Sequence, residues 1–121
     1  MAMIKFDDLP AGDGTTLQVT GDIDSSNAAE LRENLRRAAV HGAVVIDLRT
    51  VPFMDSAGLG ALICGVREIR TAGGRAALCV RRGSVQRLLS VTGFDRVVPI
   101  GATVEEAHAA ITVGEVPEAV A

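Results

Sequence analysis

Apolar and polar residues follow one another along the chain in patterns that predict strands first and then strands alternating with helices. The segments MIKFDDL (3–9) and TTLQVTGDI (15–23) have the composition and spacing of strands. The turn sequence AGDG (11–14) joins them, so we expect a hairpin. The runs AVVIDL (43–48) and RAALCV (75–80) are short and continuously apolar, which is typical of strands buried on both faces of a sheet.

Apolar residues at three- and four-residue spacing predict two longer helices between these strands. The segment DSSNAAELRENLRRAAVHG (24–42) contains one, with Asn27 and Glu30 in a capping-box arrangement and Gly42 as the terminator. A second helix begins at the sequence Asp-Ser of residues 55–56 and runs to about residue 71. These helices supply the apolar faces that cover the sheet.

The C-terminal third predicts shorter elements. The segment SVQRLLSVTG (84–93) predicts a short helix with Ser84 at its cap. VVPI (97–100) predicts an edge strand, and TVEEAHAAI (103–111) predicts a last helix capped by Thr103. The order of elements is that of an α/β protein. We expect a mixed sheet of about four to five strands with about four helices.

The length of 121 residues fits a single domain, which we place at residues 1–112, followed by a flexible tail at 113–121. Segments 43–48 and 75–80 should be parallel and joined by a right-handed crossover.

Apolar residues make up 48 % of the chain, but no run approaches the roughly 20 needed to span a bilayer, and no signal peptide is visible. We therefore expect a cytoplasmic protein without membrane contacts.

Isolated cysteines and histidines argue against a metal site or a cofactor. Cys64 and Cys79 lack paired spacing and are expected to be reduced, partly buried apolar residues. His41 and His108 are expected to face solvent or a helix end. The net charge is −3, although residues 67–96 contain seven arginines and two acidic residues. That segment has no interleaved aromatic residues for base stacking, so we expect a solvated basic face and no nucleic-acid partner.

The stretch VPFMDSAGLGAL (51–62) places a carboxylate, a hydroxyl and two glycines where a strand meets a helix N-terminus. Asp55 and Ser56 are both preferred caps, and we expect Ser56 to cap the helix, a role that contributes about 1 kcal/mol. A hydroxyl at this anion-tolerant place is also suited to phosphorylation. A phosphate beside Asp55, and near Asp22 and Asp24 if their loop lies at the same end of the sheet, would change the surface potential more than the fold. The pattern alone leaves a cap and a binding switch open.

Three motifs together resemble the bacterial anti-sigma factor antagonists, which are single STAS domains. They are Gly21-Asp22-Ile23-Asp24, Asp55-Ser56-Ala57-Gly58-Leu59-Gly60 and Thr92-Gly93-Phe94. The resemblance extends through LQVTGDIDSSNAAELRENL and covers nearly the whole chain apart from the tail.

The resemblance implies a regulatory protein that is not an enzyme. In that family the unphosphorylated antagonist binds an anti-sigma factor that is also a serine kinase, which frees the sigma factor. ATP-dependent phosphorylation of the serine after the motif aspartate, here Ser56, ends the binding, and a PP2C-type phosphatase restores it. The next position is often Ser or Thr in the family and is Ala57 here, so Ser56 is the only hydroxyl of its motif.

The partner is expected to contact the start of the helix and the loop before the first helix, and the protein to be a monomer or a weak dimer. The expected contact residues are Asp22, Asp24, Ser25, Ser26, Asp55, Ala57, Gly58 and Leu59. Two alternatives remain. One is a STAS subunit of a stress-sensing or lipid-transport complex with a vestigial serine. The weaker one is a nucleotide-hydrolysing enzyme, since the stretch has neither a G-x-S-x-G elbow nor a phosphate-binding loop.

Overall fold

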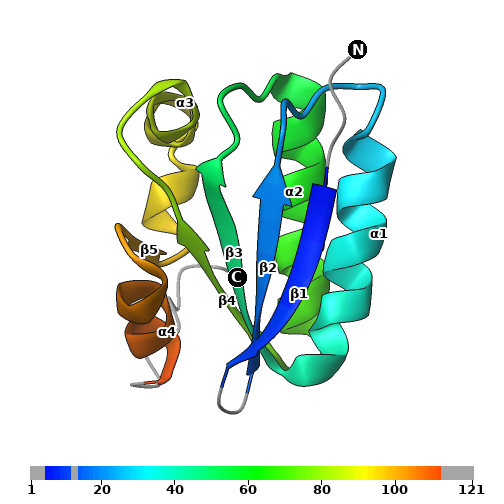
Figure 1. Cartoon of the computed structure of the whole chain (residues 1–121), viewed down its shortest axis with the longest axis vertical. Helices are drawn as coiled ribbons and strands as arrows, with labels where there is room; N and C mark the ends of the chain where they lie inside the picture. Colours follow the sequence, from blue (N-terminus) through cyan, green and yellow to red (C-terminus); the bar gives the residue numbers. More distant parts are fainter. Residues whose placement is uncertain (1–4, 12–13, 113–121) are drawn as a thin grey trace.

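The computed structural model describes residues 5–11 and 14–112 and contains one five-stranded sheet in the order β1-β2-β3-β4-β5 (Figure 1). The first pair, β1 with β2, is antiparallel, and every later neighbour is parallel. The predicted mixed sheet and the predicted parallel pairing of residues 43–48 with 75–80 are therefore confirmed. The strands are β1 (Lys5–Ala11), β2 (Gly14–Thr20), β3 (Ala43–Thr50), β4 (Arg75–Cys79) and β5 (Ile100–Gly101).

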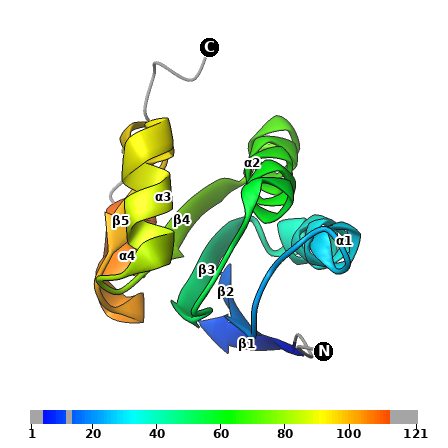
Figure 2. The same ribbon diagram turned by 90° about the horizontal axis from the view of Figure 1, so that it is seen from above.

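Four α-helices cover the sheet from both sides. Helices α1 and α2 lie side by side on one face, and α4 packs on β3, β4 and β5 from the other (Figure 2). Helix α3 adds Val85 and Leu89 to the core that α1 and α2 form with the sheet. The helices are α1 (Ala28–Ala38), α2 (Ser56–Thr71), α3 (Ser84–Thr92) and α4 (Val104–Thr112), with short 3-10 turns η1 (Ala39–His41) and η2 (Phe94–Arg96).

The central strand β3 is buried on both faces, as its unbroken apolar run predicts. Val44 and Ile46 belong to the large core under α1 and α2. Val45 belongs to the smaller core under α4, together with Ala77 and Cys79. Because successive side chains of a strand point to opposite faces, one short run supplies both cores. Strand β3 therefore runs through the middle of the molecule, and its carboxyl end leads directly to residues 51–56.

Two predicted helix and strand ends differ from the structure, and one is confirmed. The N-cap position of α3 is Gly83, so the prediction of Ser84 as the cap is wrong. Strand β5 covers residues 100–101 and not the expected 97–100, because Val97 is the C-cap of η2 and its amide donates to the Phe94 carbonyl at 3.1 Å. Pro99 has no N–H and only accepts a bond from the Leu78 amide at 2.9 Å. The prediction of Thr103 as a cap is confirmed, since its Oγ1 accepts from the Glu106 amide at 3.0 Å.

Helix α1 begins after Asn27 as predicted, but no capping box forms. The Asn27 side chain makes no cap bond to the helix. Its Oδ1 instead accepts from the Asp24 amide at 3.0 Å and its Nδ2 donates to the Asp22 carbonyl at 2.9 Å. Asn27 thus stabilises the loop before the helix. Gly42, at φ +83°, ends the segment as predicted.

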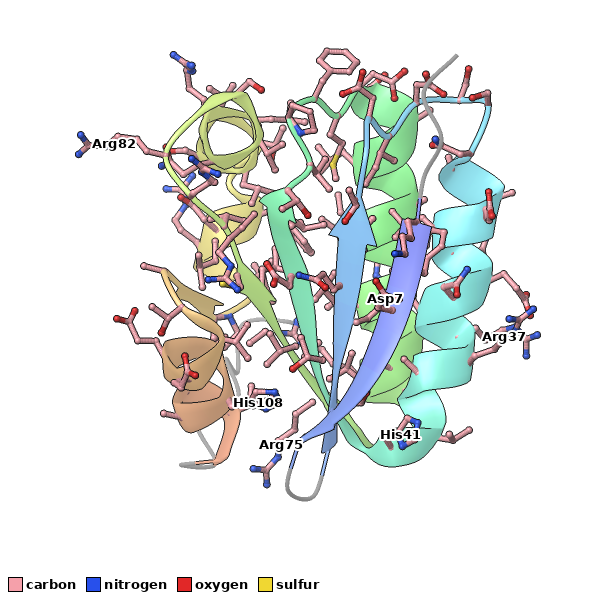
Figure 3. The ribbon with its side chains drawn as sticks, in the orientation of Figure 1. Asp7, Arg37, His41, Arg75, Arg82 and His108 are labelled. Carbon is pink, nitrogen blue, oxygen red and sulfur yellow. The ribbon has the colours of Figure 1, made fainter. Side chains whose placement is uncertain are left out.

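The two histidines differ in their surroundings (Figure 3). His41 is exposed, as expected. His108 lies partly buried on the sheet side of α4, where its Nε2 is 2.8 Å from Thr16 Oγ1, so the expectation that it faces solvent or a helix end is wrong. Burial lowers its pKa. Cys79 is buried and Cys64 is partly buried, and both are free thiols, as predicted.

Two sequence predictions fall outside the part of the chain that the structure describes. They are the turn residues 12–13 and the tail at 113–121. Within residues 5–11 and 14–112, no helix is long and apolar enough to cross a membrane. The same ranges contain no group of three His, Cys, Asp or Glu residues placed to hold a metal ion.

Candidate functional site

Two segments about 30 residues apart in the sequence meet where α2 begins. The segment between β3 and α2 lies beside the loop between β2 and α1, and Ile23 forms an isolated parallel bridge with Met54. The Ile23 amide donates to the Phe53 carbonyl at 2.9 Å, and the Asp55 amide donates to the Ile23 carbonyl at 3.1 Å. The expectation that the Asp22–Asp24 loop and the Ser56 region share one end of the sheet is confirmed.

Asp55, rather than Ser56, caps α2. Its extended backbone, at φ −97° and ψ −173°, positions Oδ1 to accept from the Gly58 amide at 2.9 Å. Ser56 is the first residue of the helix, its side chain is exposed, and its hydroxyl makes no hydrogen bond to any residue that the structure describes. The prediction of Ser56 as the cap is therefore wrong, and its hydroxyl is available for chemistry.

The two glycines of the motif have different surroundings. A Cβ on Gly58 would lie 2.6 Å from Ile23 Cγ2 and 2.9 Å from Met54 Cγ. A Cβ on Gly60 would meet nothing within 4 Å. Gly58 is thus required for the close contact between α2 and the neighbouring loop, whereas packing within this domain does not require Gly60.

Three acidic residues, Asp22, Asp24 and Asp55, lie at the end of the sheet where α2 begins. The Asp24 carboxylate accepts from the Ser26 amide at 2.9 Å and from the Ser26 hydroxyl, and the Ser26 side-chain bond is the main cause that lowers the pKa of Asp24. Asp22, Asp24 and Asp55 make no ion pair with any residue in the described ranges. This end of the molecule therefore presents three partly exposed acidic residues that no described cation neutralises by an ion pair.

The predicted contact residues differ in their exposure to solvent. Ser25, Ser26 and Ser56 are exposed, and Asp22, Asp24, Asp55 and Ala57 are partly exposed. Gly58 and Leu59 are buried, so within this domain they pack the start of α2 against the loop.

Phe53 is 49 % exposed and stands three residues before Ser56. Sequence reasoning missed it, although an aromatic side chain between Pro52 and the polar cap is unusual for a core position. It adds an apolar contact to an otherwise polar and acidic surface.

A shallow groove of about 560 Å³ lies between α1 and α2. Small residues, among them Ala29, Gly60 and Cys64, form part of its lining. Arg32 and Glu68 join its two sides by an ion pair at 2.8 Å. Gly60 is one helical turn from Ser56, so the groove begins next to the hydroxyl.

Comparison with known proteins identifies the family. The family model described as "STAS domain" matches residues 7–107. The chain belongs to the STAS domain family. A relative of this STAS domain, the anti-sigma-B factor antagonist of Bacillus subtilis (strain 168), is 33 % identical over 90 residues, which cover 74 % of this chain and 83 % of the relative.

Solved structures share the fold of this STAS domain. An anti-sigma factor antagonist from Mycobacterium paratuberculosis matches with a TM-score of 0.82 and 25 % identity, over 91 % of this chain and 95 % of that one. The antagonist SpoIIAA in its unphosphorylated form matches with a TM-score of 0.71 and 20 % identity, over 93 % and 100 %. The phosphorylated form of SpoIIAA matches with a TM-score of 0.65 and 18 % identity, over 90 % and 99 %.

Proposed function

We propose that this STAS domain is an anti-sigma factor antagonist whose unphosphorylated form binds an anti-sigma factor, and that phosphorylation of Ser56 ends the binding. The names of its relatives support the first part. The second part is supported by one observation above all: the hydroxyl of Ser56 is exposed, makes no hydrogen bond to the described residues and lies beside a separate cap residue.

Phosphorylation at this position leaves the fold intact. The cap bond belongs to Asp55 Oδ1, so a modified Ser56 loses no hydrogen bond to the described residues. The N-terminus of α2 carries partial positive charge and unpaired N–H groups, which favour an attached phosphate. In the transfer, Ser56 Oγ bonds to the γ-phosphorus of ATP, the bond to the β-phosphate oxygen breaks, ADP leaves, and a base of the kinase takes the hydroxyl proton.

The added charge acts on the surface that the partner would contact. A phosphoserine brings a charge of about −1.5 to −2 at neutral pH. It would stand near three carboxylates, those of Asp22, Asp24 and Asp55, which already carry unpaired charge. A partner that fits the neutral hydroxyl and the exposed Phe53 ring would meet a strongly negative surface instead.

The proposed partners follow from the switch. The anti-sigma factor supplies the kinase activity, and a PP2C-type phosphatase removes the phosphate. Because Ala57 has no hydroxyl, one phosphate per motif is the maximum. The domain itself has no catalytic activity in this proposal, so the purified protein should not turn over ATP or GTP.

Capture experiments on matched variants test the proposal. Tagged wild type, Ser56→Ala and Ser56→Asp are used to capture the anti-sigma factor from the protein's own cells, with Ser90→Asp as the control because it adds the same charge at an exposed position of α3. Wild type, Ser56→Ala and Ser90→Asp should retain the anti-sigma factor, and Ser56→Asp should lose it. Equal retention by Ser56→Asp would refute the switch, and capture of an unrelated assembly by every variant would refute the proposed partner.

A further inference from the structure

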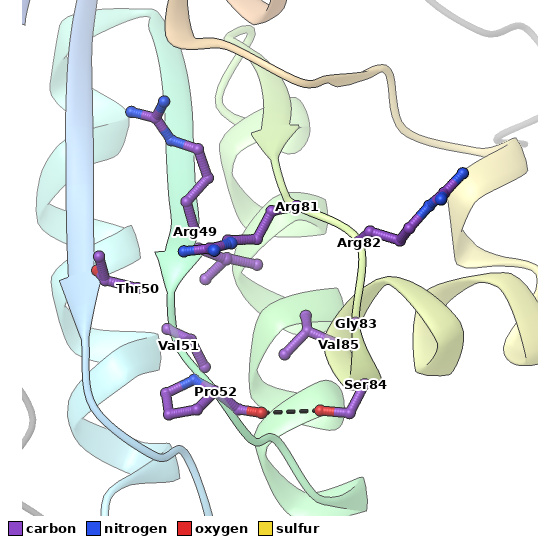
Figure 4. A pocket seen from close by; sticks show the side chains of 10 residues that line it. Arg49, Thr50, Val51, Pro52, Arg81, Arg82, Gly83, Ser84 and Val85 are labelled. Atoms are coloured by element: carbon purple, nitrogen blue, oxygen red, sulfur yellow. Dashed lines mark hydrogen bonds between the residues drawn. The ribbon is translucent and has the colours of Figure 1, made fainter.

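A pocket with a basic lining lies at the same end of the sheet as Ser56 but on the other side of β3. Its volume is about 270 Å³, and it lies between the carboxyl end of β3 and the loop that joins β4 to α3 (Figure 4). Arg49, Arg81 and Arg82 line it, and none of its described lining residues is acidic. The proposed switch at Ser56 does not use this pocket.

Two of the three arginines make no ion pair within the part of the chain that the structure describes. Arg49 is paired with the buried Asp47, with Nη2 2.9 Å from Oδ2 and Nε 3.0 Å from Oδ1. Arg81 and Arg82 make no ion pair with any residue in the ranges 5–11 and 14–112. Arg81 lies across the pocket toward β3, and Arg82 extends away into solvent (Figure 4). The segment before α3 therefore presents positive charge on both sides.

Ser84 follows these arginines directly and has an exposed side chain. It is the first residue of α3, whose N-cap position is Gly83. The Ser84 hydroxyl donates one hydrogen bond, at 2.7 Å, to the carbonyl of Pro52 (Figure 4). The hydroxyl is thus accessible, is not needed to cap the helix, and touches the segment that leads to Ser56.

We propose that Ser84 is a second phosphorylation site, modified by a serine kinase that recognises arginines immediately before the acceptor. Arg81 and Arg82 stand three and two residues before Ser84 and can pair with carboxylates in such a kinase. The γ-phosphoryl group of ATP is transferred to Ser84 Oγ as the bond to the β-phosphate oxygen breaks. ADP leaves, and the hydroxyl proton passes to a base of the kinase.

The pocket accommodates the product. Its volume of about 270 Å³ leaves room for a phosphoryl group beside the Ser84 hydroxyl. A phosphoserine opposite arginine forms new charge-assisted hydrogen bonds. A phosphoserine has no hydroxyl proton, so it loses the hydrogen bond that Ser84 donates to the Pro52 carbonyl. The modification therefore exchanges a contact with the segment before α2 for contacts within the pocket.

The two serines therefore differ in electrostatic environment. Ser56 follows Asp55 directly and shares its end of the sheet with Asp22 and Asp24, whereas Ser84 follows two arginines that make no ion pair with the described residues. A kinase that selects basic residues is directed to Ser84 and not to Ser56. The two modifications can be scored separately, and the proposal for Ser84 does not depend on the function proposed for Ser56.

Site mapping on the full chain tests the proposal. The protein is isolated from its own cells across growth and stress conditions, and phosphate on Ser84 is sought by peptide mass spectrometry. Phosphate at Ser84 is the expected result, and its absence under all conditions would overturn the proposal. Ser56→Ala should keep the Ser84 phosphate, which separates this outcome from failure of the Ser56 switch.

A reaction with a known kinase tests the role of the arginines. Purified protein is incubated with ATP and the catalytic subunit of cyclic-AMP-dependent protein kinase, which prefers basic residues before its acceptor. Ser84→Ala should abolish the incorporated phosphate, and the matched control Ser90→Ala, also in α3, should not. Arg81→Ala combined with Arg82→Ala leaves the Ser84 bond to Pro52 in place and should slow phosphorylation by on the order of a hundredfold, the effect of losing two charge-assisted hydrogen bonds at about tenfold each. Phosphorylation of this double variant at the wild-type rate would overturn the assigned recognition.

Discussion

Replacing Gly58 or Gly60 by alanine makes the same chemical change at two positions of one motif, and the structure predicts opposite effects on stability. At Gly58 the new methyl group would lie 2.6 Å from Ile23 Cγ2 and 2.9 Å from Met54 Cγ. Ile23 is fully buried, and its carbonyl accepts the Asp55 amide, so it cannot move away freely. The loop and the start of α2 must separate.

The cost at Gly58 can be worked from these contacts. Overpacking in a well-packed region costs about 1–3 kcal/mol. Separation of the loop from α2 weakens the bond between the Asp55 amide and Ile23, which contributes about 0.5–1.5 kcal/mol. Alanine recovers up to about 1 kcal/mol of helix propensity. The expected net loss in the free energy of unfolding is about 1–3 kcal/mol.

The substitution at Gly60 should stabilise the domain. A Cβ there meets nothing within 4 Å, so the new methyl group causes no steric conflict. The helix gains about 1 kcal/mol because alanine replaces an exposed glycine in its interior. If Gly60 serves the close approach of a partner along the α1–α2 groove, Gly60→Ala should also weaken capture of that partner.

Thermal and urea unfolding of the two variants measure these effects. At about 2.1 cal/mol/K per residue, 1 kcal/mol corresponds to about 4 °C for a chain of this length. Gly58→Ala should lower Tm by about 4–12 °C, and Gly60→Ala should raise it by about 4 °C. Equal Tm values for the two variants, or a Gly58→Ala protein as stable as wild type, would show that the packing argument is wrong.

Three further outcomes follow from single side chains. Asp55→Ala removes the cap acceptor and should cost about 1 kcal/mol, whereas Asp55→Asn should retain most of that stability in urea denaturation. In the folded protein at about pH 8, a thiol reagent should modify Cys64 and spare Cys79, because burial raises the pKa of the Cys79 thiol to about 11. Mass spectrometry identifies the modified residue. Both thiols should react in urea, and rapid modification of Cys79 in the folded protein would contradict its burial. Burial lowers the pKa of His108 below its ordinary 6.5, against an opposing effect of Glu105. The unfolded chain therefore binds the proton more tightly than the folded protein. The stability that the neutral His108 side chain contributes is present above pH 6.5 and is lost as the pH falls. Urea midpoints at about pH 7 and pH 5 should therefore differ less for His108→Gln than for wild type, and an equal difference would exclude His108 as the source.

Much of the fold follows from local patterns. The unbroken apolar run in residues 43–48 predicts a strand covered on both faces, and β3 has that burial because helices lie on both sides of the sheet. The strand-to-helix junction at Asp55 and Ser56 is also a local signal. The start of the last strand was less predictable, since Val97, its expected first residue, is the C-cap of η2.

The roles of individual polar groups depend on contacts that no local pattern encodes. Asp55 and Ser56 are both good caps by type, and the extended backbone of Asp55 decides between them. His108 is partly buried because α4 packs it beside Thr16, which is 92 residues away in the sequence. The bond from Ser84 to Pro52 likewise joins residues 32 apart.

The sequence by itself determined the succession of elements, the α/β class and the motif that contains Ser56, because periodicity and turn residues act over short distances along the chain. The tertiary structure alone decided which glycine is required and, among residues 5–11 and 14–112, that the Ser56 hydroxyl makes no hydrogen bond and that Arg81 and Arg82 make no ion pair. Each of these properties depends on atoms that come together only when the sheet forms. The loop after β2 must lie against the start of α2 before Gly58 is confined and Ser56 stands exposed among carboxylates.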